Sequence, residues 1–336
     1  MSKLMVYRDE HADLLKLSNK KVVVIGYGNQ GRAQAQNLRD SGVSVSVASI
    51  RDQSAQQAES DGFHVIPIEG CASRADILML LIPDEFQKEI FEKFLRDNLQ
   101  PGQALCFGHG YNFHFGLIKP PAYIDVILVA PRMIGAIVRK TFTQGTGVPA
   151  YVAVGQDGSG HAKDIMLAIA KGIGSTRVGV VEMNFESETI LDLFIEQTLM
   201  PIFTKSMLYA FEILVEEGFD PGVVTLEMYG SGEIAEVFKA CAETGFYEQL
   251  FRFHSRTAQY GELSRKETIL PTEIRAAMAK ELENIRLGGF AKEWSQEEQH
   301  SFPQFNRLLK EARQHPINKA ERDIAKLIDL GPSFHS

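Results

Sequence analysis

Short apolar runs alternate with helical patterns through the first half of the chain, from about Lys20 to Glu182. Continuous runs of Val, Ile and Leu are typical of strands that helices cover on both faces. Strands that alternate with helices predict a Rossmann-type α/β fold, a doubly wound parallel sheet. The predicted strands are Val22–Ile25, Val43–Ala48, Ile77–Ile82, Ala104–Phe107, Val126–Val129, Ala150–Val154 and Arg177–Val181.

After Phe185 the strand-like runs stop and helical patterns continue. We therefore predict two domains, a dinucleotide-binding domain over 1–183 and an all-helical domain over 184–331. The segment Ile190–Met200 is apolar around most of its circumference, which predicts a buried helix. The expected helical segments are Glu188–Glu217, Ile234–Glu243, Pro271–Gly288, Gln304–Ala312 and Asn318–Leu330.

A glycine-rich loop follows the first strong strand and leads into a helix expected from about Gly31 to Arg39. In this context the first glycine permits a tight turn and the second lets backbone approach a pyrophosphate. The third allows close packing of helix on strand. The loop therefore predicts an NAD(P)H site, formed by Gly26-Tyr27-Gly28-Asn29-Gln30-Gly31.

The end of the second strand bears on which nicotinamide cofactor is used. Arg51 with Ser54 could hold a 2′-phosphate, which favours NADPH. Asp52 would instead accept from the ribose hydroxyls and repel a phosphate, which favours NADH. The pattern slightly favours NADPH, and NADH is the alternative.

Acidic residues follow in the helical half. Asp192 and Glu196 are four apart, so they share one helix face, and buried carboxylates need a cation or donor. Mg²⁺ would suit them; the alternatives are a solvent-facing stripe or pairing with Lys205. Glu227 and Glu233 could each complete a metal site, but their spacing of six does not place both on one helical face.

Two further candidates lie at the ends of predicted strands, where open α/β sheets bind ligands. His109, between two glycines, suits general acid/base work near neutral pH, with a structural role for the loop as the alternative. Arg132 could hold a substrate carboxylate or a phosphate.

Composition limits the remaining classes. With 44% hydrophobic residues, the chain is globular, and a net charge of −8 argues against non-specific nucleic-acid binding. Three scattered cysteines predict free thiols in a reducing compartment. We see no signal peptide and no run of about 20 uninterrupted apolar residues, so we expect a soluble, cytoplasmic protein with no membrane partner.

Several motifs together resemble the ketol-acid reductoisomerases (acetohydroxy acid isomeroreductases), and the likeness covers nearly the whole chain. The length resembles the short-chain class, which has one knotted helical domain and forms dimers or higher oligomers. The motifs are the loop from Val24 to Gly31, Ala75-Asp76-Ile77 through Ile82-Pro83-Asp84-Glu85, Gly108–Gly116, Asp192-Leu193-Phe194-x-Glu196-Gln197 and Gly289-Phe290-Ala291-Lys292-Glu293-Trp294.

The resemblance implies an enzyme of branched-chain amino-acid biosynthesis. It would move an alkyl group in a 2-acetohydroxy acid and then reduce the new ketone with NAD(P)H to a 2,3-dihydroxy acid. Asp192 would bridge two Mg²⁺ and Glu196 would bind one, while Glu227 and Glu233 would come from the partner chain of a homodimer. The resemblance further implies His109, Arg132 and Glu196 as catalytic residues, Pro83 and Gly135 as cofactor contacts, and Ser255 as the substrate-binding serine.

The chain also departs from the family pattern. The family usually has Lys-x-Pro-Gly where this chain has Arg132-Met133-Ile134-Gly135, and arginine cannot give up its proton. The family's second pair of glutamates is four apart. If Glu227 takes the first position of that pair, Ser231 stands at the second. If Glu233 takes the second position, Tyr229 stands at the first. The alternative is therefore a diverged member that reduces another 2-keto or 2-hydroxy acid without the isomerase step.

Overall fold

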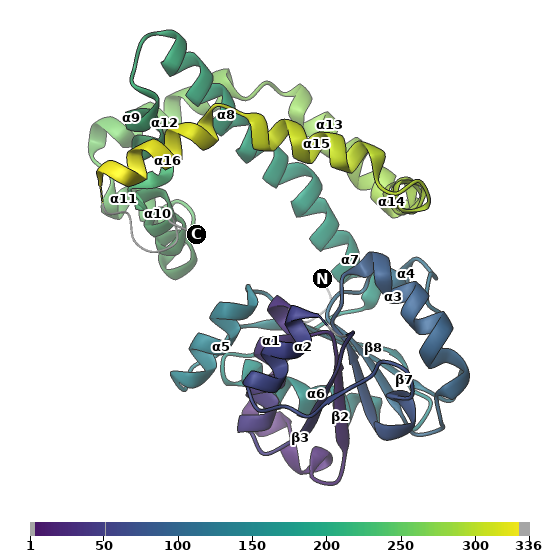
Figure 1. The fold of residues 1–336 in the computed structure, drawn as a ribbon. Helices are drawn as coiled ribbons and strands as arrows, with labels where there is room; N and C mark the ends of the chain where they lie inside the picture. Colours follow the sequence, from purple (N-terminus) through teal and green to yellow (C-terminus); the bar gives the residue numbers. More distant parts are fainter. Residues whose placement is uncertain (1–3, 51, 329–336) are drawn as a thin grey trace. The chain divides into compact units, whose positions relative to one another are not determined.

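The computed structural model describes residues 4–50 and 52–328. The chain divides into two compact units, Met1–Asp192 and Leu193–Ser336, which are described separately below. The first is an α/β unit, and the second consists of helices joined by turns, with no strand among its described residues (Figure 1). The predicted fold class, a Rossmann-type sheet followed by an all-helical region, is confirmed.

Nine strands form one sheet within the described part of the first unit, in the order β1-β9-β8-β7-β6-β5-β2-β3-β4. Every predicted apolar run overlaps one of them, although Arg177 belongs to a 3₁₀ turn that precedes its strand. Two edge strands of two residues each, β1 and β4, were too short to predict. The strands are β1 (Val6–Tyr7), β2 (Lys21–Ile25), β3 (Ser44–Ala48), β4 (Val65–Ile66), β5 (Ile77–Leu80), β6 (Ala104–Phe107), β7 (Asp125–Pro131), β8 (Ala150–Gln156) and β9 (Val180–Glu182).

The sheet is parallel from β4 through β3, β2, β5 and β6 to β7. β8 then runs antiparallel to β7, and β1 runs antiparallel to β9. We expected the Ala150–Val154 run to be a parallel strand, and this is corrected. A strand covered on both faces is apolar along its length whichever way it runs, so the pattern carried no direction.

Helices cover both faces of this sheet, which explains the unbroken apolar runs. Alternate residues of a strand point to opposite faces. Val22 and Val24 join the core that includes Leu38 of α1, whereas Val23 and Ile25 join the core that includes Phe91. The helices of this unit are α1 (Asn29–Asp40), α2 (Gln53–Ser60), α3 (Asp84–Ile90), α4 (Tyr111–His114), α5 (Gly135–Thr143), α6 (Ala162–Gly172) and most of α7 (Phe185–Phe194).

The helical unit has a small core where Phe211, Val224 and Ala320 pack together. They come from α8, α9 and α16, and α16 lies against α9 (Figure 1). Four of its helices, α9, α11, α12 and α14, were not predicted. The helices are α8 (Met200–Glu216), α9 (Pro221–Thr225), α10 (Glu233–Thr244), α11 (Glu248–Phe253), α12 (Arg256–Ile269), α13 (Glu273–Arg286), α14 (Gly289–Gln299), α15 (Pro303–Gln314) and α16 (Ile317–Leu327), with π turns η7 (Ile195–Leu199) and η8 (Leu226–Gly230).

The apolar segment Ile190–Met200 is not buried as predicted. Leu191, Ile195 and Leu199 are 47%, 43% and 49% exposed, whereas Leu193 and Thr198 are buried. A helix that is apolar all round needs neighbours on every side, and a single chain supplies them on one side only. The expected burial of Asp192 and Glu196 is therefore also wrong, since Asp192 is half-buried and Glu196 is exposed.

The same helix, continuous from Phe185 to Glu216, is long enough to cross a membrane and has a mean hydropathy of 1.3 over its most apolar window. Length and composition are weak evidence for a membrane-spanning helix, because core helices of soluble proteins can be equally long and apolar.

Candidate active site

His109 lies just past the carboxyl end of β6, in the short loop that leads into α4. Its Nδ1 is 3.2 and 3.3 Å from the two carboxylate oxygens of Glu188, and 3.7 Å from Oδ2 of Asp192. Both acids lie on α7. The strand end that the sequence singled out therefore faces a pair of carboxylates within the first unit.

Glu188 is the residue that the sequence analysis missed. Its side chain is fully buried, and one oxygen accepts a hydrogen bond of 2.8 Å from the backbone N–H of Gly110. A Cβ at position 110 would lie 2.5 Å from Oγ1 of Thr189, so only glycine permits this approach of α7. The signal was available, because Glu188 precedes Asp192 by four residues and shares its helix face.

Arg132 follows β7 directly and completes the cluster. Its guanidinium donates to Oδ1 of Asp192, and its Nη1 is 3.5 Å from Oε1 of Glu188. The guanidinium carbon lies 5.0 Å from the ring centroid of Tyr151, a cation–π contact from β8. The cation that compensates Asp192 in the described structure is thus an arginine of the same unit.

Burial and the charges in this cluster shift the pKa values of two side chains, His109 and Asp84. Burial alone would lower the pKa of His109, but its hydrogen bond with Glu188 and the negative charges of Glu188, Asp84 and Asp192 outweigh burial and raise the pKa to about 9. Burial raises the pKa of the nearby Asp84 carboxyl to about 6. The His109 ring is therefore positively charged near neutral pH.

The two carboxylates of this cluster, Glu188 and Asp192, could hold a divalent ion. One ligand atom each from His109, Glu188 and Asp192 lies within 4.8 Å of the others. Two carboxylates on one helix face suit Mg²⁺, which prefers oxygen ligands. The donor set therefore fits one ion at this place, on the condition that the Arg132 guanidinium leaves Oδ1 of Asp192.

The glycine-rich loop adopts the predicted strand-turn-helix arrangement. Gly26 has a φ of +94°, and α1 begins at Asn29, two residues before the predicted Gly31. A Cβ on Gly31 would lie 2.2 Å from the carbonyl oxygen of Gly26, which explains the third glycine as a packing requirement. Gln30 donates a 2.7 Å hydrogen bond to the carbonyl of Met133, which joins the loop to the segment after β7.

Two neighbouring pockets of about 440 Å³ each open beside this loop and share Tyr27 and Gly28. A Cβ on Gly135 would lie 1.9 Å from the carbonyl oxygen of Asn29, so this glycine lets the start of α5 pack on the loop. The predicted cofactor residues in the first pocket are Gly26, Tyr27, Gly28, Asp52, Ser54 and Pro83, and those in the second are Tyr27, Gly28, Asn29 and Gly135.

Asp52 and Ser54, which the sequence predicts to lie near the cofactor ribose, are held by local hydrogen bonds. Asp52 caps α2 by accepting from the N–H of Ala55 at 3.0 Å, and Ser54 donates its hydroxyl proton to Asp52 at 2.7 Å. The hydrogen bond from Ser54 is the largest cause of the lowered pKa of Asp52, so the group is a carboxylate. Arg51 lies outside the described residues.

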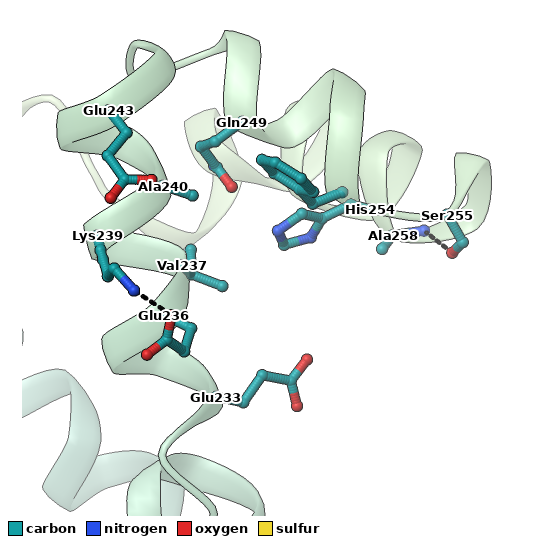
Figure 2. A pocket seen from close by; sticks show the side chains of 11 residues that line it. Glu233, Glu236, Val237, Lys239, Ala240, Glu243, Gln249, His254, Ser255 and Ala258 are labelled. Carbon is teal, nitrogen blue, oxygen red and sulfur yellow. Dashed lines mark hydrogen bonds and ion pairs between the residues drawn. The ribbon is translucent and has the colours of Figure 1, made fainter.

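Figure 2 shows a pocket of about 540 Å³ within the helical unit. Two sequence-predicted residues, Glu233 and Ser255, line it, together with Glu236, Lys239 and His254. The Ser255 hydroxyl accepts from the N–H of Ala258 at 3.3 Å and caps α12.

Glu227 and Tyr229 do not line that pocket. Glu227 is exposed on the π turn η8. The hydroxyl of Tyr229, on the same turn, donates to Glu321 of α16. Glu196 lies on the other π turn, η7.

Comparison with known proteins covers both units. The family model for the NADPH-binding domain of acetohydroxy acid isomeroreductase matches residues 16–179, and that for the C-terminal domain of ketol-acid reductoisomerase matches residues 185–329. A ketol-acid reductoisomerase (NADP(+)) from Methanopyrus kandleri is 44% identical over 326 residues, covering 96% of this chain and 98% of its relative.

Solved structures agree with this result. An NADH-preferring ketol-acid reductoisomerase from an uncultured archaeon matches with a TM-score of 0.92 and 35% identity, over 97% of this chain and 99% of the other. A semialdehyde dehydrogenase NAD-binding protein from Cupriavidus necator matches with a TM-score of 0.60 and 16% identity, over 80% of this chain and 99% of the other. At that identity the match shows a shared fold alone. This chain belongs to the ketol-acid reductoisomerase family, as its motifs predicted.

Proposed function

We propose that this protein is an NAD(P)H-dependent ketol-acid reductoisomerase of branched-chain amino-acid biosynthesis. It converts a 2-acetohydroxy acid of the acetolactate type into a 2,3-dihydroxy acid by alkyl migration and hydride transfer. The observation that carries the proposal is the cluster of His109, Glu188, Asp192 and Arg132 at the carboxyl ends of β6 and β7. It lies in the same unit as the dinucleotide loop, in a chain that belongs to this family.

The residues of the cluster have separate tasks. The buried Glu188 holds the His109 ring and orients it toward substrate. The charged His109 can donate its proton to an oxygen that becomes an alkoxide, and the Arg132 guanidinium can donate hydrogen bonds to the substrate carboxylate. Glu188 and Asp192 would hold Mg²⁺, which when bound would polarise the substrate oxygens as a Lewis acid. Glu196, Glu227, Glu233 and Ser255 remain proposed contributors to metal and substrate binding.

A second candidate function is favoured by one observation, the ion pair between Arg132 and Asp192. A guanidinium can stabilise the oxygen that forms when a ketone is reduced, and reduction needs no rearrangement of the carbon skeleton. The chain would then reduce a 2-keto acid without moving an alkyl group.

One assay separates the two candidates. Acetolactate and its already rearranged 2-keto-3-hydroxy isomer are each incubated with NADPH or NADH and Mg²⁺, and cofactor oxidation is followed by absorbance. The proposed function predicts turnover of both compounds. Turnover of the rearranged isomer alone supports the second candidate, and turnover of neither contradicts both.

The cofactor preference depends on Asp52, whose carboxylate lines the pocket beside Gly28. A carboxylate there repels a 2′-phosphate, whereas a serine hydroxyl would donate to it. We expect Asp52→Ser to raise the ratio of kcat/KM for NADPH over NADH by about tenfold, roughly 1.4 kcal/mol. Steady-state kinetics with both cofactors measures this ratio, and an unchanged ratio would mean that Asp52 does not face the ribose.

The active form is a homodimer or higher homo-oligomer in the cytoplasm. Large apolar side chains lie exposed on the helical unit, among them Ile213 (58%), Phe246 (68%) and Phe253 (65%), and soluble monomers rarely leave such surface uncovered. Light scattering should therefore give at least twice the chain mass of 37.4 kDa. A monomeric mass at micromolar concentration would contradict this.

A further inference from the structure

Glu188 and Asp192 already share the guanidinium of Arg132, in addition to their contacts with His109. Arg132 donates through one terminal nitrogen to Oδ1 of Asp192, and its other terminal nitrogen lies 3.5 Å from Oε1 of Glu188. Since Glu188 is fully buried, its charge needs a partner close by. The guanidinium is therefore part of the charge balance of this carboxylate pair.

Arginine is suited to this position in a way that lysine is not. A guanidinium presents donors in a planar fork and so can address both carboxylates, whereas an ammonium is a single point of charge. It also stays protonated at neutral pH and well above it. Tyr151 packs against the guanidinium, with its ring centroid 5.0 Å from the central carbon. Arg132 is thus fixed by three side chains.

The helical unit also departs from the family pattern, in which two glutamates lie four residues apart. Neither Glu227 nor Glu233 has a second acid four residues further on, since those positions are Ser231 and Val237. Val237 lines the pocket of Figure 2 together with Glu233. A set of ligands with one carboxylate fewer balances less positive charge.

We infer that Arg132 is a built-in competitor of the divalent ion at the Glu188–Asp192 pair. An ion can reach Oδ1 of Asp192 only when the guanidinium leaves it, so each binding event loses the arginine–carboxylate contact. Arg132 therefore sets the apparent affinity of this site for the metal. The inference rests on the proposed function for the site's role, but metal uptake can be measured without substrate or turnover.

The test is isothermal titration of the EDTA-treated full-length protein with MgCl₂ in the absence of substrate. We expect Arg132→Met, which keeps an unbranched side chain about as long as the arginine stem and removes the charge, to bind Mg²⁺ at least about tenfold more tightly than the natural protein. The matched control is Arg96→Met, which removes an exposed arginine paired with Glu92, and its Mg²⁺ affinity should be unchanged. Equal affinities of the natural protein and Arg132→Met would overturn the inference, as would weaker binding by Arg132→Met.

Arg132→Lys keeps the protein testable if the methionine variant does not fold. Its single ammonium can hold one carboxylate at a time, so the Mg²⁺ affinity should fall between those of the natural protein and Arg132→Met. Mn²⁺ binding followed by electron paramagnetic resonance counts free ions independently, and the order of affinities should be the same. A lysine variant that binds no more tightly than the natural protein would contradict the competition. If none of these proteins turns over substrate but the order holds, the proposed function fails and this inference stands.

Discussion

Replacing Gly31 with alanine is expected to disrupt the dinucleotide loop itself. The added Cβ would lie 2.2 Å from the carbonyl oxygen of Gly26 and 3.5 Å from Cγ1 of Val24, so α1 must move away from β2. Overpacking of this kind costs about 1–3 kcal/mol. At about 2–4 °C per kcal/mol, the melting temperature should fall by several degrees. NADPH affinity should fall at least about a hundredfold, because the pyrophosphate site is built from the same loop.

Gly28→Ala is the matched control for this variant. An added Cβ at position 28 meets no atom within 4 Å, and the φ of −78° is ordinary for alanine. The melting temperature should therefore be unchanged. Cofactor affinity should still fall, because the second glycine is where the backbone approaches the pyrophosphate. Thermal unfolding and fluorescence titration with NADPH measure the two effects, and equal melting temperatures of the two variants would contradict this account of Gly31.

Asp192→Asn is expected to remove catalysis and spare the cofactor. The carboxylate faces His109 and accepts from Arg132, and an uncharged amide can balance neither the guanidinium nor a divalent ion. Removing one electrostatic contributor to a transition state commonly costs about 10²–10³ in kcat. We expect a loss of that size, with NADPH affinity changed by less than about twofold, since Asp192 does not line either pocket of the dinucleotide loop.

Asp164→Asn provides the control, because Asp164 is an exposed acid of the same unit, paired with Lys16. It should retain both activity and cofactor affinity. If Asp192→Asn lost turnover and NADPH affinity by the same factor, the separate roles assigned to Asp192 and the glycine loop would be wrong.

The sequence predicted the α/β unit well because its signals are local. Val22–Ile25 alternates between two buried faces, and Gly26, Gly28 and Gly31 carry backbone requirements that need no partner elsewhere in the chain. The antiparallel direction of β8 has no such local signal. It depends on which neighbour the strand pairs with, and hydrophobicity does not encode that.

The site was predicted only in part for a related reason. His109 was found because glycines and a strand end mark it, but its partner Glu188 is 79 positions further along. Only the fold brings the two together. The burial of Asp192 and Glu196 was mispredicted, because an apolar helix was assumed to find its neighbours within one chain, where Ile195 and Leu199 remain exposed.

The proposal of a complete reductoisomerase is tested most directly by following the carbon skeleton of the product. Acetolactate labelled with ¹³C in the methyl group on C2, the group that migrates, is incubated with the protein, NADPH and Mg²⁺, and the product is identified by NMR. The account predicts a 2,3-dihydroxy acid with both methyl groups on C3, formed in step with NADPH oxidation. Recovery of acetolactate with its skeleton unchanged, or of a reduced product in which no methyl group has moved, would contradict it.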